Sequence, residues 1–203
     1  MSAHIVAEIT QLQDRGTSMS VATRELIRVR RPTAPPRDIV DAPAFTLGRP
    51  LAGLRVGLRH EGSWRSWMWI VEEWTDMLRA DGAEPVVLEA GGRVGDEGVK
   101  TKADVAAWVA DIDCGISGLG TCGSCTSNSV HDAVTLENDA KPAIVAVCEE
   151  FQHHGRNMAS FLGHGNLKML VLPYPLEGRP EAEIRAIGRD HYERFLTLLG
   201  ATR

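Results

Sequence analysis

The sequence lacks an excess of positive charge and is poor in aromatic residues. Its 203 residues include 22 Lys and Arg against 27 Asp and Glu, a formal net charge of −5, and Phe, Trp and Tyr make up only 5 %. Proteins that bind nucleic acid cluster Lys and Arg along one face, often with aromatic residues between them. The sequence contains no such stripe. We therefore expect no nucleic-acid partner.

Long apolar runs are also absent. The longest runs, 141–148 and 167–175, are far shorter than the roughly 18–20 residues that a membrane helix needs. The first residues, MSAHIVAEITQLQDRG, show no basic segment followed by an apolar one, which a secretory signal would have. We expect a cytoplasmic protein that makes no membrane contact.

Cysteine is scarce, and two nucleotide-binding motifs are missing. Four cysteines are too few for the disulfide framework of a secreted domain. A chain of this length with 43 % hydrophobic residues buries an adequate core without one. No predicted strand is followed by GxGxxG or by GxxxxGK with Ser or Thr, so no motif supports dinucleotide or nucleoside triphosphate binding.

The first fifty residues differ in composition from the rest. They contain five of the ten prolines, Pro32, Pro35, Pro36, Pro43 and Pro50. The proline-rich stretch 28–50 is extended and supports no helix, whereas 3–12 and 20–29 could each form a short helix or strand. Because it carries apolar side chains such as Ile39 and Phe45, we predict that 1–50 is an N-terminal arm packed against a neighbouring subunit, in a homo- or hetero-oligomer. The alternative is a disordered leader.

From residue 51 to 203, β-branched apolar runs alternate with segments of helical period. The predicted strands are 54–58, 85–89, 114–119, 143–147 and 169–172. The predicted helices begin after a Ser63 cap and end before Asp81, then cover 103–112, 124 or 126 to 138, 150–162 and 180–199. Five strands alternating with five helices predict an α/β domain with a doubly wound, mostly parallel, flavodoxin-like sheet.

Ligands of such sheets bind at the carboxyl ends of the strands, where the strand order reverses. The segments that follow the predicted strands are His60–Gly62, Gly120–Cys125, Cys148–Glu150 and Pro173–Pro175. From these loops we expect substrate contacts from His60, Trp64, Gly120, Thr121, Ser124 and Tyr174. Trp64 is equally consistent with an oligomer contact.

Two cysteines form the strongest motif, at Cys122 and Cys125. The segment leaves a buried strand through glycines and enters a helix, where unpaired backbone N–H groups and the helix dipole favour a thiolate. Cys122 is the predicted nucleophile, and Cys125, three residues on, can resolve a mixed disulfide. The alternative is a pair of structural thiols beside a turn.

At this motif the chain resembles the UGSC-type family, in which selenocysteine or cysteine precedes Gly-Ser-Cys. The matching segments are Gly118–Ser127, Val130–Val134, Leu136–Glu137 and Val145–Val147. The family's likeness to selenocysteine-bearing subunits of glycine- and proline-type reductases implies thiol-based reduction of a small molecule. Tyr174 and Cys148 depart from the family pattern, which has histidine and a hydroxyl residue at these positions.

Other side chains near the motif have predicted supporting roles. Glu149 and Glu150 follow a strand and can give or take a proton, although one of them could simply cap the next helix. His131 and Asp132 lie on the helix after the motif, where we expect hydrogen bonds to neighbouring loops. Cys114 begins a strand far from the motif and is predicted to be a core residue.

Metal binding is a competing interpretation. Cys122, Cys125, Cys148 and one histidine would complete a tetrahedral zinc or iron–sulfur site, although no second CxxC is present. The leading hypothesis requires no cofactor: a thiol-dependent enzyme, with a thiol reductant as partner, that transforms a small organic molecule. Two alternatives stay open, a cysteine nucleophile without redox chemistry and a metal-binding or redox-sensing subunit of a larger complex.

Overall fold

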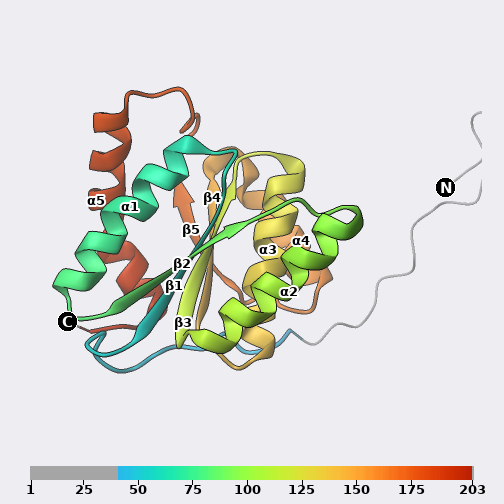
Figure 1. The fold of residues 1–203 in the computed structure, drawn as a ribbon, viewed down its shortest axis with the longest axis horizontal. Helices are drawn as coiled ribbons and strands as arrows, with labels where there is room; N and C mark the ends of the chain where they lie inside the picture. Colours follow the sequence, from blue (N-terminus) through green and yellow to red (C-terminus); the bar gives the residue numbers. More distant parts are fainter. Residues whose placement is uncertain (1–40, 203) are drawn as a thin grey trace, which may run out of the picture. The chain divides into compact units, whose positions relative to one another are not determined.

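Five parallel strands form the centre of residues 41–202, the part of the chain that the computed structural model describes (Figure 1). The strands are β1 (Arg55–Glu61), β2 (Glu84–Ala90), β3 (Cys114–Gly120), β4 (Ala143–Cys148) and β5 (Lys168–Leu172). Their order is β2-β1-β3-β4-β5, and every neighbouring pair is parallel. This is the strand order of flavodoxin-like sheets. The predicted fold class is confirmed.

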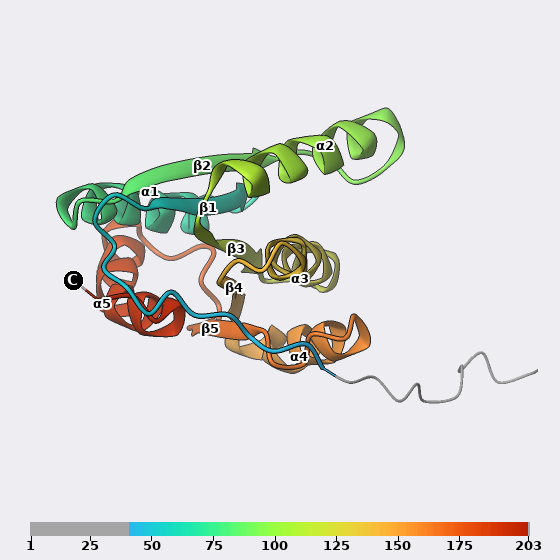
Figure 2. The same cartoon turned by 90° about the horizontal axis from the view of Figure 1, so that it is seen from below.

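Helices cover both faces of the sheet. They are α1 (Arg65–Ala80), α2 (Gly95–Asp111), α3 (Gly123–Asn138), α4 (Gln152–Phe161) and α5 (Glu181–Leu199), and a short 3-10 helix, η1 (Glu149–Phe151), precedes α4. Helices α1 and α5 lie on one face, and α2, α3 and α4 lie on the other (Figure 2). In the described part of the chain, no helix is long and apolar enough to cross a membrane.

Two helix starts differ from the prediction. Helix α2 begins at Gly95 rather than at residue 103, so Gly98 lies inside the helix, where a Cβ would lie 2.6 Å from the carbonyl of Arg93. Helix α1 is capped at Trp64, not at Ser63, and its N-cap side chain makes no hydrogen bond. The carboxylate of Glu177 serves there instead, accepting from the Ser66 backbone N–H at 3.1 Å.

Each face of the sheet buries its own apolar core. The core under α1 and α5 contains Trp67, Trp74, Tyr192 and Phe195, all fully buried. The core under α2, α3 and α4 is built from smaller side chains such as Val130, Leu136 and Val145, with Trp108 at its margin. The two cores fix the strands between rigid layers, so the loops at the strand ends have defined positions.

Residues 41–50, the described end of the predicted arm, lie along the amino ends of the strands (Figure 2). The Ala42 N–H donates to the Gly163 carbonyl at 2.8 Å, and the Leu47 N–H donates to the Leu199 carbonyl at 2.9 Å. The Lys168 ammonium donates to the Phe45 carbonyl at 2.7 Å. This segment therefore packs on its own chain. Residues 1–40 lie outside the described residues, so the intersubunit contact stays a prediction.

Candidate functional site

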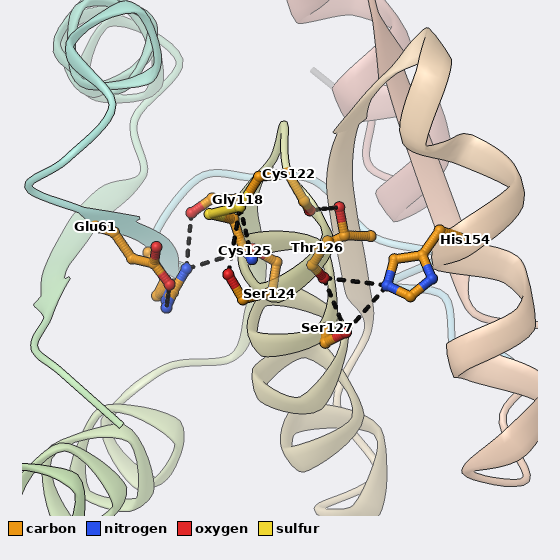
Figure 3. The surroundings of a disulfide bond; sticks show 11 residues. Glu61, Gly118, Cys122, Ser124, Cys125, Thr126, Ser127 and His154 are labelled. Atoms are coloured by element: carbon orange, nitrogen blue, oxygen red, sulfur yellow. Dashed lines mark hydrogen bonds and ion pairs between the residues drawn. A yellow bond between two sulfur atoms is a disulfide. The ribbon is translucent and has the colours of Figure 1, made fainter. Parts of the chain in front are cut away.

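The two motif cysteines lie where β3 leads into α3, at the carboxyl edge of the sheet (Figure 3). Cys122 is the N-cap residue of α3, and Cys125 lies in its first turn. Their sulfur atoms form a disulfide across a Cα–Cα distance of 5.2 Å. The start of the helix fixes this distance, because the side chain of an N-cap residue lies over the first turn, beside the residue three positions later.

The two sulfurs differ in exposure. Cys125 is buried in the first turn, at 8 % of its full exposure, whereas Cys122 is half-buried and its neighbours Gly123 and Ser124 are exposed. A substrate or an external thiol therefore reaches Cys122 first. The difference fits an attacking Cys122 and a shielded partner.

Polar hydrogens surround the sulfur of Cys122. The backbone N–H of Cys125 donates to Sγ at 3.1 Å, and the hydroxyl of Ser124 lies 3.5 Å from the same atom. Once the disulfide is reduced, these donors and the positive end of the helix dipole favour the thiolate form of Cys122. Ser124, an expected substrate contact, is thus a direct neighbour of the sulfur.

A histidine from α4 contacts the same turn, a role that sequence reasoning did not assign. The Nε2 atom of His154 lies 3.1 Å from the carbonyl oxygen of Gly123 and 3.1 Å from Oγ of Ser127 (Figure 3). Gly123 is the residue between Cys122 and Ser124. Adjacent His153 is exposed. Only the docking of α4 on α3 distinguishes the two histidines, and no local pattern marks it.

Gly120, the last residue of β3, and Thr121 lead into the turn that carries the cysteine pair. Gly120 is buried, and a Cβ there would lie 2.7 Å from Val147 and 2.9 Å from the Thr126 hydroxyl oxygen, so its place is set by close packing. The hydroxyl of Thr121 hydrogen-bonds the sulfur of Cys148. Gly120 is thus closed off by packing, whereas Thr121 is half-buried and its predicted substrate contact stays a prediction.

Cys148 is fully buried at the end of β4, on the α1 and α5 face of the sheet. Burial is the largest effect on its thiol and raises the pKa, although the hydrogen bond from Thr121 opposes this. Within residues 41–202, no three His, Cys, Asp or Glu side chains are grouped so that they could hold a metal ion. Cys148 is therefore not gathered with Cys122 and Cys125 into a ligand set.

The predicted acid–base residues lie at the rim of this edge. Glu149 and Glu150 are both exposed in η1, directly after Cys148. Tyr174, in the loop after β5, is 45 % exposed and packs edge-on against Phe151, with ring centroids 6.0 Å apart. These three residues surround the carboxyl edge without a described contact to either motif sulfur.

A buried ionic cluster lies beside α3. Arg59 of β1 is fully buried, and its Nη atoms donate to the Gly118 carbonyl at 2.8 Å and to Glu61 at 2.7 Å. Its Nε lies 2.9 Å from Asp132, outside hydrogen-bond geometry, so this contact is an ion pair only. Arg93, in the loop after β2, donates from both Nη atoms to the same carboxylate. Asp132 thus connects α3 with two other elements, as expected of a supporting residue.

His60 and Trp64 make their described contacts on the α1 side of the sheet. Strand alternation points His60 to the α1 face, where it lines a cavity of about 480 Å³ with Met68, Val71 and Val87. Burial is the main reason why the pKa of His60 is lowered. Trp64 packs against the aromatic core. Neither side chain has a described contact with the two motif sulfurs, so their role in substrate binding stays a prediction.

Two further cavities adjoin α3. One, of about 410 Å³, lies at the carboxyl ends of β1 and β2 and includes Ser63, Arg93 and Asn128. The other, of about 390 Å³, lies between α2 and α3 and includes Arg93, Asn128 and His131. Asn128 is one helical turn beyond Cys125, so both cavities begin close to the cysteine pair. Each has the volume of a small-molecule site.

Fold and site together define a class: a flavodoxin-like α/β protein with a CxxC disulfide at the start of the helix that follows β3. The sequence pattern of the UGSC family matches residues 28–201, and the chain belongs to this family. No curated protein matches the chain.

Proposed function

We propose that the protein is a thiol-dependent oxidoreductase that acts on a small organic molecule, with Cys122 as nucleophile and Cys125 as resolving thiol. The observation that carries the proposal is the asymmetric disulfide at the N-terminus of α3. One sulfur is accessible and receives hydrogen bonds, and the other is shielded within bonding distance. This is the division of labour that thiol–disulfide exchange needs.

The proposed reaction conserves atoms and electrons. The Cys122 thiolate attacks the substrate atom that carries the leaving group and forms a bond from sulfur to that atom. The leaving group departs with the electron pair of its own bond and takes up a proton. The Cys125 thiol, losing its proton, then attacks Sγ of Cys122. The disulfide forms, and the bond between Sγ of Cys122 and the substrate breaks. The substrate fragment leaves with the electron pair of that bond and takes up a proton. Two thiols have been oxidised and the substrate reduced by two electrons. An external dithiol or two monothiols return the disulfide to the dithiol.

The surroundings support a site for a small molecule. The exposed carboxylates Glu149 and Glu150 are proton donors or acceptors at the same edge of the sheet. The cavity that includes Ser63 and Asn128 lies beside the point where the strand order reverses, between β1 and β3. Ligands of doubly wound sheets bind at such points.

The test is Cys125→Ser. With a disulfide-containing probe such as oxidised glutathione, the variant is expected to retain a mixed disulfide on Cys122, because attack proceeds and resolution does not. Cys122→Ser should trap nothing, and Cys114→Ser is the matched control that leaves the pair intact. Peptide mass spectrometry identifies the adduct.

Two results contradict the proposal. If Cys125→Ser traps no adduct and keeps full turnover, while Glu149→Gln or Glu150→Gln loses it, Cys122 works as a nucleophile without redox chemistry. If the purified protein carries stoichiometric zinc or iron that Cys122→Ser removes, the cysteine pair holds a metal instead.

We further propose that the protein works as an oligomer in the reducing cytoplasm, where a thiol reductant is at hand. The support is the proline-rich, partly apolar composition of 1–40 and the scarcity of cysteine. Removing 1–40, and leaving 41–50 on the domain, is expected to lower the mass of the assembly in sedimentation. An unchanged mass would contradict the role of this segment.

A further inference from the structure

His154 is a half-buried link between two helices that the proposed reaction does not use. Its ring reaches from α4 to the first turn of α3, where Nε2 meets both the Gly123 carbonyl and the Ser127 hydroxyl at 3.1 Å (Figure 3). The Ser127 hydroxyl also donates to the Gly123 carbonyl, at 3.0 Å. Two side chains, those of His154 and Ser127, therefore converge on one peptide inside the cysteine motif.

The contact fixes where the imidazole carries its proton. A carbonyl oxygen only accepts hydrogen bonds, so Nε2 must be the protonated nitrogen. An Nε2 that bears hydrogen cannot accept the proton of Ser127. The Ser127–His154 pair is therefore not a nucleophile with its base, although its separation would allow that assignment. The histidine acts as a donor to the backbone.

Donation to the Gly123 carbonyl acts on the peptide that joins Gly123 to Ser124. Hydrogen bonding at a carbonyl polarises the amide, and the N–H of the same peptide becomes a stronger donor. That N–H belongs to Ser124, one of the unpaired donors at the start of α3. The Ser124 hydroxyl already lies 3.5 Å from Sγ of Cys122. The contact therefore holds the peptide that leads directly into the Ser124 side chain and the Cys125 N–H, the two groups that lie next to the sulfur.

We propose that His154 is a positioning residue for the cysteine pair: by holding the Gly123 carbonyl, it keeps the Cys122–Cys125 turn in the geometry that stabilises the Cys122 thiolate. The inference rests on the proposed role of Cys122 as nucleophile. His154 touches neither sulfur in the contacts described here, so it acts through the backbone of the turn.

Three variants of the full chain test the proposal. His154→Leu removes the donor, and His154→Gln keeps an N–H near the position of Nε2. His153→Leu makes the same change at the exposed neighbouring histidine. The first readout is the rate at which iodoacetamide alkylates Cys122 in the reduced protein, at pH 7 and at pH 9.5. The second is the equilibrium of the Cys122–Cys125 disulfide with glutathione.

At pH 7, His154→Leu is expected to lower the alkylation rate about threefold, the size of effect that one hydrogen bond to a neutral group provides. The difference should nearly vanish at pH 9.5, where the thiol is ionised in every variant. At pH 9.5, where the reduced form is the thiolate, the disulfide should become about threefold harder to reduce, because that thiolate is less stable in the variant. His154→Gln should restore most of both effects, and His153→Leu should match the wild type.

Two results would overturn the proposal. Equal rates for His154→Leu and His153→Leu would show that the contact has no effect on the sulfur. A loss of the same size at both pH values, not restored by glutamine, would show a general loss of structure. Both readouts need no substrate, so they are independent of turnover. If no mixed disulfide forms on Cys125→Ser but the His154 effect is present, only the proposed function fails.

Discussion

The two faces of the sheet bury very different side chains. Under α1 and α5, Trp74 stacks on Phe195 with ring centroids 4.7 Å apart and meets Trp67 edge-on at 5.6 Å. Under α2, α3 and α4, small aliphatic residues share the interior with ionised groups, Arg59 and Asp132 among them. The aromatic face supplies dense apolar packing. The mixed face fixes orientation through polar contacts, and it carries the cysteine pair.

Strand β1 shows how one segment serves both faces. Leu58 and His60 point to the aromatic side, and Arg59 and Glu61 point to the side of α3. Because side chains alternate along a strand, each residue of β1 is committed to one role. The difference between the faces can be tested by changing one side chain at a time, beginning with the thiols.

The thiols should react very differently on the two sides of the sheet. Burial raises the pKa of the Cys114 thiol from 9.0 to about 12. At pH 8 its thiolate fraction is then roughly a thousandfold below that of an ordinary thiol. After reduction, iodoacetamide followed by peptide mass analysis should label Cys122 and leave Cys114 unmodified. Comparable labelling of both would contradict the assignment of the site.

The same shift predicts the pH dependence of stability. A thiol whose pKa is higher in the folded than in the unfolded protein favours folding fully below the unfolded value. That contribution is lost as the pH rises from about 9 toward 12. Cys114→Ala should therefore flatten the decline of the unfolding free energy above pH 9, measured by urea titration.

Trp74→Ala should strongly destabilise the aromatic face. The side chain is fully buried, and its Nε1 donates to the Gly188 carbonyl at 2.7 Å. Loss of its contacts and of that donor is expected to lower the free energy of unfolding by about 4–5 kcal/mol. Val134→Ala on the other face is the comparison, at roughly 1.5 kcal/mol for two methyl groups. Equal losses in urea unfolding would remove the distinction between the faces.

Asp132→Leu should destabilise the mixed face by a different mechanism. It leaves the buried Arg59 guanidinium with a single carboxylate, Glu61, and frees Arg93 from α3. Removing one member of a buried ionic cluster is expected to cost about 3–4 kcal/mol in urea unfolding. Adding Arg59→Met should recover part of this loss, because the unpaired charge is then gone. A double variant less stable than Asp132→Leu would show that Arg59 stabilises the fold on its own.

Sequence predicted the parts of the molecule that depend on local patterns. A continuous apolar run rich in β-branched residues is typical of a strand buried on both faces of a parallel sheet. It predicts a strand at 143–147, and β4 ends one residue later. The cysteine motif was found because three-residue spacing at a helix start is a local signal. Because side chains alternate along a strand, the sequence also places His60 and Arg59 on opposite faces of the sheet.

Contacts between distant elements could not be predicted in this way. His154 reaches the motif only because α4 packs on α3, and the cap of α1 comes from residue 177. Neither partner has a fixed sequence separation from the group that it serves. The loop that carries Glu177 follows β5, which is separated from β1 by two strands in the sheet, so its contact with α1 depends on the order of the strands.

The smallest effect is expected at this long-range cap. The Glu177 carboxylate accepts from the N–H and, at 2.6 Å, from the hydroxyl of Ser66, at the positive end of the α1 dipole. Glu177→Gln keeps an acceptor and loses the charge, so the expected loss is about 0.5–1 kcal/mol in urea unfolding, and smaller still in high salt. Asp104→Asn, which breaks an exposed ion pair with Lys100 in the middle of α2, is the control and should cost less. Equal, salt-independent losses in both variants would show that the Glu177 charge does not interact with the start of α1. A loss of stability confined to Glu177→Gln would show that a single charge orients a helix on the aromatic face as well, because α1 belongs to that face.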